Sequence, residues 1–102
     1  MLEDFEIEQS ADYEGEDWWT WAVWVEGDAE SLDQIEFVEW SLHPTFSNPI
    51  RKIYDRSSNF RLETGGWGTF PIVARVHMKD GRDAKLRHYL ELLYSDGTPT
   101  EK

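Results

Sequence analysis

The sequence predicts an all-β domain, an immunoglobulin-like sandwich of two antiparallel sheets. Apolar and polar residues alternate with a period of two along most of the 102 residues, as in half-buried strands. Turn residues interrupt this alternation about every ten residues, which suits roughly seven short strands. Six Trp, five Phe and four Tyr supply the large buried area that a small core needs. We therefore expect one domain over residues 1–102, with its core at about 5–95 and a flexible tail at 96–102.

Three strands are expected in the first half of the chain. Residues 5–8 alternate apolar and acidic side chains, and the polar segment 12–17 is interpreted as a turn. Residues 18–25 are apolar on both faces, which is typical of a strand inside a sandwich or of a strand that offers one face to a ligand. Gly27 and Asp28 end this run, and residues 38–42 predict the next strand.

The second half predicts strands around two unusual loops. In chain order these are a loop with two prolines at 43–49, short strands at 50–54 and 60–63, a glycine-rich loop at 65–68 and a long strand at 70–78. Residues 79–81 then predict a hairpin turn. Residues 84–94 fit a strand by alternation and a helix by residue type, and the preceding hairpin turn leads us to predict a strand.

Charge is distributed unevenly along the chain. Residues 1–50 contain 14 Asp or Glu and no Lys or Arg, whereas residues 51–102 contain ten Lys or Arg and seven Asp or Glu, which gives −14 and +3 within a total of −11. Nucleic acid is not an expected partner, because binding it requires a basic face. The acidic half either attracts a basic partner or is simply a solvated surface.

The absence of cysteine excludes a disulfide framework, a thiolate nucleophile and a cysteine-based metal site. It fits a reducing compartment, so we expect a cytoplasmic protein, or a nuclear one if the source is eukaryotic. The first residues lack the basic and apolar regions of a secretory signal. No apolar stretch approaches the roughly 20 residues that span a bilayer, so no membrane association is expected.

The sequence predicts no enzyme, no cofactor and no metal. His77 and His88 lie on opposite sides of the predicted hairpin and could pair, but no third metal ligand is evident. The acidic residues offer no distinct catalytic pair. No glycine loop precedes a helix in the manner of a phosphate-binding site. We therefore expect a non-catalytic binding module.

The two loops are the candidate binding features. Residues 42–46 read Leu-His-Pro-Thr-Phe and place a hydroxyl beside an aromatic ring, and residues 65–70 read Gly-Gly-Trp-Gly-Thr-Phe. An aromatic ring among glycines has few neighbours to pack against, and backbone without side chains lets a ligand approach closely. The alternative is that the glycines serve turn geometry while Phe46 and Trp67 cap the core.

These motifs, together with Trp-Ala-Val-Trp-Val-Glu-Gly at 21–27 and Asn48-Pro49, resemble the YEATS domain family over about residues 5–95. The resemblance implies an immunoglobulin-like sandwich that recognises an acylated lysine or a similar planar acyl amide on a peptide or protein. Phe46 and Trp67 would sandwich the amide. The Thr45 hydroxyl and the Trp67 backbone N–H would bond to it, and His43 would position the hydroxyl loop. The rest of the expected pocket is Gly66, Gly68 and Phe70.

The start of the second strand departs from the eukaryotic pattern and looks closer to the prokaryotic branch of the family. Trp18 and Trp19 stand there, and either could extend the aromatic pocket or belong to the core. Two other functions remain open, a carbohydrate-binding module and a protein–protein interaction domain that uses the aromatic patch. The resemblance further suggests that the domain is part of a larger multidomain protein or complex.

Overall fold

A computed structural model describes residues 5–100 of the chain. The elements in chain order are β1 (Glu6–Gly15), β2 (Trp18–Glu26), α1 (Ala29–Asp33), β3 (Ile35–Ser41), β4 (Ile50–Ile53), a 3-10 turn (Arg56–Ser58), β5 (Leu62–Gly66), β6 (Pro71–Met78) and β7 (Asp83–Tyr89). Strands therefore dominate the described part of the chain, as the alternation predicts.

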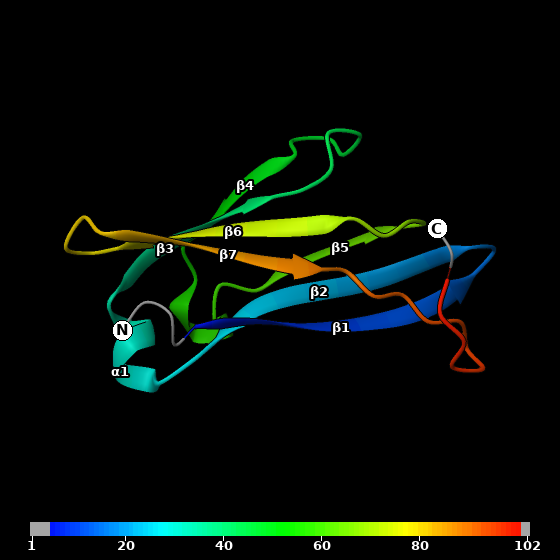
Figure 1. Ribbon diagram of the computed structural model, residues 1–102, viewed down its shortest axis with the longest axis horizontal. Coiled ribbons are helices and arrows are strands. Elements are labelled where there is room, and N and C mark those ends of the chain that lie inside the picture. The colour runs from blue at the N-terminus through cyan, green and yellow to red at the C-terminus, as the bar shows by residue number, and fades with distance from the viewer. Residues whose placement is uncertain (1–4, 101–102) are drawn as a thin grey trace.

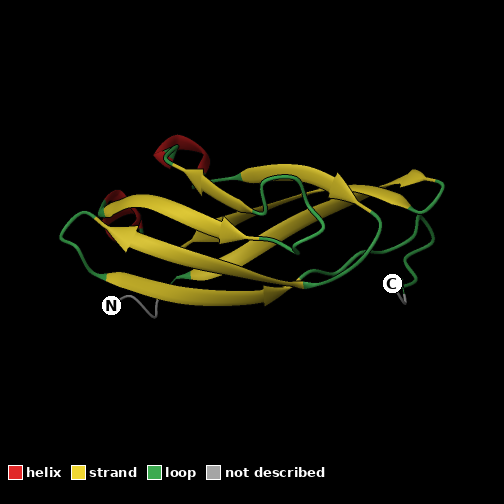
Figure 2. Cartoon of the chain, turned by 90° about the horizontal axis from the view of Figure 1, so that it is seen from above, coloured by secondary structure: helices red, strands yellow, loops and turns green. Residues whose placement is uncertain are grey.

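The strands form two antiparallel sheets. One sheet has the order β1-β2-β5 and the other β4-β3-β6-β7, and every neighbouring pair is antiparallel. The sheets lie as two layers with their strands along the long axis of the molecule (Figure 1), and the view from above shows the same alignment (Figure 2). The predicted immunoglobulin-like sandwich is confirmed.

The first turn is shorter than predicted. Residues 12–17 were expected to form it, but β1 continues to Gly15 and only Glu16 and Asp17 turn, both with positive φ. Asp12 and Glu14 belong to the exposed outer face of β1, while Tyr13 on the inner face packs against a core aromatic ring. The outward-facing residues of an exposed strand are polar, and in the sequence alone they resemble the polar residues of a turn.

Strand β5 begins and ends later than predicted. Asn59 and Phe60 have φ of 57° and 60°, so the chain reverses there and the fully buried Phe60 side chain enters the core. Gly65 and Gly66 were expected in a loop, but they pair with β2 as the last residues of β5. The loop that follows therefore consists of residues 67–70.

The C-terminal part of the chain combines a strand with an irregular segment. The strand prediction for 84–94 is confirmed up to Tyr89, after which Leu90 and Leu92 enter the core without strand pairing. Within the expected flexible tail, residues up to Thr100 are hydrogen-bonded, with Thr100 N–H donating to the Leu92 carbonyl at 3.0 Å. An Asp-Gly turn at 96–97 makes this possible, and residues 101–102 lie outside the described range.

Helix α1 has no counterpart among the sequence predictions. Asp28 caps it by accepting a hydrogen bond from the Ser31 N–H at 3.3 Å, and Leu32 buries its side chain. The helix is one turn long and buries only Leu32, so it is too short for a helical repeat of apolar residues to show in the sequence.

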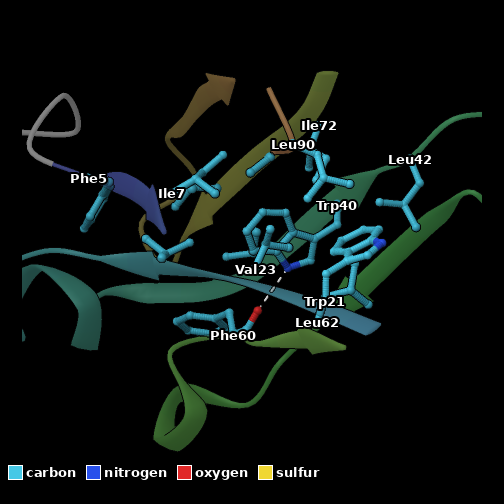
Figure 3. Packing of buried hydrophobic residues seen from close by; sticks show 14 of the residues in the cluster. Phe5, Ile7, Trp21, Val23, Trp40, Leu42, Phe60, Leu62, Ile72 and Leu90 are labelled. Carbon is cyan, nitrogen blue, oxygen red and sulfur yellow. Dashed lines mark hydrogen bonds between the residues drawn. The ribbon is translucent and has the colours of Figure 1, made fainter. Parts of the chain in front are cut away.

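Aromatic side chains fill the space between the sheets. Trp40 of β3 is fully buried, and its indole N–H donates to the Phe60 carbonyl at 3.0 Å (Figure 3). Trp19 of β2 is also fully buried, and its N–H donates to the Leu93 carbonyl at 2.7 Å. Each of these hydrogen bonds offsets the cost of burying an indole N–H.

Gln9 joins strand β1 to the segment that follows β7. Its side-chain amide donates to the Glu91 carbonyl at 2.8 Å, and its carbonyl oxygen accepts from the Glu91 N–H at 2.9 Å. The same oxygen lies 2.7 Å from Nε2 of His88, which donates to it. These contacts tie one edge of the three-stranded sheet to the edge of the other sheet.

We expect His88 to make the fold less stable in mild acid. Burial lowers the pKa of His88 below its ordinary 6.5, against the opposing effect of Glu91 and Glu8. Between the native and the unfolded pKa, the unfolded chain binds more protons at His88 than the native chain does. The contribution of His88 to the free energy of unfolding is therefore complete above pH 6.5 and is lost as the pH falls through the native pKa. Urea unfolding at pH 7.5 and pH 5.0 measures the change in the free energy of unfolding between these conditions.

The matched variant is His88→Gln, which keeps a hydrogen-bond donor but does not titrate. All other titratable groups are present in both proteins, so the difference between the two proteins reports on His88. The parent should lose more unfolding free energy between the two pH values than the variant does. Equal losses would contradict the assignment.

Candidate functional site

Hydrogen bonds hold the β3–β4 loop, residues 42–49, in a defined shape. The Leu42 N–H donates to the Pro49 carbonyl at 2.7 Å and closes the loop. The Arg51 guanidinium reaches back and donates to the Ser47 carbonyl at 2.9 Å. The loop is therefore fixed through its backbone, which leaves its side chains available to a ligand.

His43 orients the hydroxyl of Thr45. Nδ1 of His43 accepts a hydrogen bond from the Thr45 backbone N–H at 3.3 Å and lies 2.9 Å from Thr45 Oγ1. Because Nδ1 accepts from the backbone, the neutral ring carries its proton on Nε2 and the Thr45 hydroxyl donates its hydrogen to Nδ1. The lone pairs of Oγ1 then remain to accept a hydrogen bond from a ligand N–H.

The two aromatic rings of the predicted pair have different surroundings. Phe46 is half-buried and packs its ring against Phe70 at 5.3 Å and Trp21 at 6.2 Å between centroids. Trp67 is 63% exposed. No ring contact joins Phe46 to Trp67 in the described chain. The rings therefore do not close on each other.

A pocket of about 460 Å³ lies between the two loops. The loops leave the sheets toward the same end of the sandwich (Figure 1). The lining residues are Trp18, His43, Thr45, Phe46, Ser47, Gly65, Gly66, Trp67, Gly68, Thr69 and Phe70. No Asp, Glu, Lys or Arg belongs to this lining, in a protein of net charge −11. The pocket therefore suits an uncharged ligand with a flat face and a few polar atoms.

Seven residues of the sequence-predicted site come together in this pocket: His43, Thr45, Phe46, Gly66, Trp67, Gly68 and Phe70. The structure separates the two remaining candidates. Trp18 lines the pocket and is 46% exposed, whereas Trp19 is fully buried between Tyr13 and Tyr94. Of the two positions that the sequence left open for Trp19, the structure therefore shows the core, because its ring points into the sandwich.

Sequence reasoning missed three lining residues, Ser47, Gly65 and Thr69. Gly65 and Thr69 stand within the motif at 65–70, and Ser47 directly follows the motif at 42–46. Their place in or beside the motifs was the signal available, but whether such a residue faces the pocket depends on the loop geometry.

The other histidines take no part in this site. His77 stacks on Phe37 with centroids 4.3 Å apart, and His88 bonds to Gln9, so the two do not pair. Residues 5–100 bring together no group of three or more His, Cys, Asp or Glu that could hold a metal ion. Within the same range, neither the length nor the composition of any helix allows it to cross a bilayer.

A two-sheet sandwich with an uncharged aromatic pocket between two loops defines a small β domain with a candidate ligand pocket. The chain belongs to the prokaryotic YEATS domain family, whose model matches residues 19–91. The resemblance carried by the Leu-His-Pro-Thr-Phe and Gly-Trp-Gly-Thr-Phe motifs is thereby confirmed.

Proteins of known identity agree with this membership. The chain is 33% identical over 66 residues to transcription initiation factor TFIID subunit 14 of Schizosaccharomyces pombe, a match that covers 64% of the chain and 27% of that protein. The crystal structure of the yeast AF-9 homolog Yaf9 superposes with a TM-score of 0.74 at 23% identity, over 94% of this chain and 75% of that one. The Yaf9 YEATS domain bound to H3K27ac superposes with a TM-score of 0.67 at 23% identity over the same shares. The chain thus spans about a quarter of the length of the TFIID subunit.

Proposed function

We propose that this domain binds an acylated lysine side chain non-covalently in the pocket between the β3–β4 and β5–β6 loops. The observation that carries the proposal is the Thr45 hydroxyl, which His43 orients at the rim of a pocket without formal charge. Its free lone pairs match an amide N–H, which an acylated lysine has. An unmodified ammonium would find no carboxylate there.

Each part of the acyl amide has a partner in this arrangement. Thr45 Oγ1 accepts from the amide N–H, and the backbone N–H of Trp67 donates to the acyl carbonyl. The flat amide lies between the rings of Phe46 and Trp67, because a conjugated group stacks on aromatic faces. The Yaf9 structure with H3K27ac supports the proposal, since a domain of the same fold binds an acetylated peptide.

The geometry favours this function over the two alternatives. A sugar platform needs flat aromatic rings exposed along a sheet face, whereas Trp67 stands in a loop and Trp18 lines the same pocket. A protein interaction patch does not require a hydroxyl fixed by an imidazole. We propose that the natural partner is an acylated protein, that the domain serves a larger protein or complex, and that it does not catalyse a reaction.

Thr45→Ala is expected to weaken binding of a short acetyl-lysine peptide roughly 10- to 100-fold. The variant leaves the buried amide N–H without an acceptor, which costs about 1–3 kcal/mol. Thr45→Ser keeps the hydroxyl and should lose much less. Isothermal titration calorimetry of the three proteins measures this order.

Thermal unfolding provides the control. Thr45 is exposed, so both variants should unfold within about 0.5 kcal/mol of the parent. If Thr45→Ala binds the peptide as tightly as the parent does, the hydroxyl is not the acceptor.

A further inference from the structure

Gly65 faces the indole of Trp18. A Cβ built on Gly65 would lie 3.0 Å from Nε1 and 3.2 Å from Cζ2 of Trp18, and 3.1 Å from the Trp19 carbonyl oxygen. These distances are shorter than ordinary van der Waals contact. The edge of the indole therefore lies against the bare backbone of β5, where any side chain would be crowded.

The indole of Trp18 has no polar or aromatic partner among the described residues. Its side chain makes no hydrogen bond and no ring contact within residues 5–100, although its backbone pairs in β2. It is 46% exposed, so burial in the core does not hold it either. The described contact that would respond most directly to a change of side chain is therefore the one between the indole and the backbone of Gly65.

The neighbouring Gly66 behaves differently. A Cβ there would lie 3.6 Å from Cζ of Phe46 and 3.7 Å from Nε1 of Trp21, which is ordinary contact. Neither Gly65 nor Gly66 has a positive φ, so the backbone conformation alone requires glycine at neither position. Gly65 is distinguished by the close approach of the Trp18 ring and of the Trp19 carbonyl oxygen.

We propose that Gly65 is a positioning residue, which holds Trp18 as the outer wall of the pocket and thereby sets how strongly the site prefers longer acyl chains. This rests on the proposed binding of acylated lysine. Trp18 lines the same pocket as Phe46 and Trp67, so its ring adds apolar surface to the aromatic pair that would hold the amide. Each methylene that a longer acyl chain buries there adds about fourfold in affinity.

The first experiment needs no ligand. In a ¹H–¹⁵N spectrum each of the six Trp gives an indole N–H signal, and Trp18→Phe and Trp21→Phe assign two of them. Gly65→Ala and Gly65→Val should shift the Trp18 signal, and the Val variant should shift it further. Gly66→Ala should shift the Trp21 signal and leave that of Trp18 in place. An unmoved Trp18 signal in Gly65→Val would overturn the positioning role.

The second experiment measures selectivity with one peptide carrying either acetyl-lysine or butyryl-lysine. The parent should bind the butyryl form up to about tenfold more tightly, and Gly65→Val should reduce that ratio to about one. Trp18→Ala should reduce the ratio equally. Adding Gly65→Val to Trp18→Ala should then change it no further, because Gly65 acts only through the ring.

Two outcomes would overturn the selectivity role. One is an equal loss of affinity for both peptides in Gly65→Val, which means that the wall contacts the lysine stem. The other is a further fall in the ratio when Gly65→Val is added to Trp18→Ala. If the folded parent binds neither peptide, the proposed function fails, and the indole spectrum still decides whether Gly65 positions Trp18.

Discussion

A peptide with an acetylated lysine is expected to bind at least 100-fold more tightly than the same peptide with unmodified lysine. The lining of the pocket contains no Asp or Glu, so an ammonium that entered would lose its hydration without gaining a counter-ion. The acyl amide is uncharged, and Thr45 can satisfy its N–H. A factor of 100 corresponds to about 2.7 kcal/mol, which is below the several kcal/mol that burying one unpaired ion costs.

Because the protein is strongly acidic, the salt concentration must be controlled when the binding of the two peptides is compared. With a net charge of −11, the domain attracts any basic peptide at low salt. Calorimetry or fluorescence anisotropy near 0.15 M salt damps this attraction, because the Debye length is then about 8 Å. Equal binding of the two peptides under these conditions would mean that surface charge explains the association. The interaction-domain hypothesis would then replace the reader hypothesis.

Trp40→Ala is expected to destabilise the domain by about 3–5 kcal/mol, enough to unfold much of it. The side chain is fully buried between the sheets, so truncation leaves a large cavity (Figure 3). The Phe60 carbonyl also loses the indole N–H that it accepts at 3.0 Å. Urea unfolding followed by circular dichroism measures the change in unfolding free energy.

Trp67→Ala is the matched control, because the same residue type is exposed there. Trp67 is 63% exposed and makes no ring contact, so its removal should change the unfolding free energy by less than about 0.5 kcal/mol. It should nevertheless abolish measurable binding of the acetyl-lysine peptide. Comparable destabilisation by the two variants would contradict the division into a core tryptophan and a pocket tryptophan.

The sequence by itself determined the class of the fold and the two loops that line the candidate pocket. Alternation with a period of two indicates which side chains face the core, and β3 and β6 keep it because each sheet buries one face. The motifs at 42–46 and 65–70 identified two loops that meet at one pocket. Both motifs can be recognised from neighbouring residues alone, because an aromatic ring among glycines and a hydroxyl beside a histidine each occupy only a few positions.

The tertiary structure alone decided which tryptophan belongs to the pocket. Trp18 and Trp19 are adjacent and chemically identical, and only the pleat of β2 turns one outward and the other into the core. The extent of β1 to Gly15 and the ordered segment from Leu90 to Thr100 likewise depend on contacts with distant residues. Gly65 acquires its importance in the same way, because the ring that crosses it comes from a strand more than forty residues earlier. Such contacts depend on how the strands pair and pack, and short-range sequence patterns do not predict them.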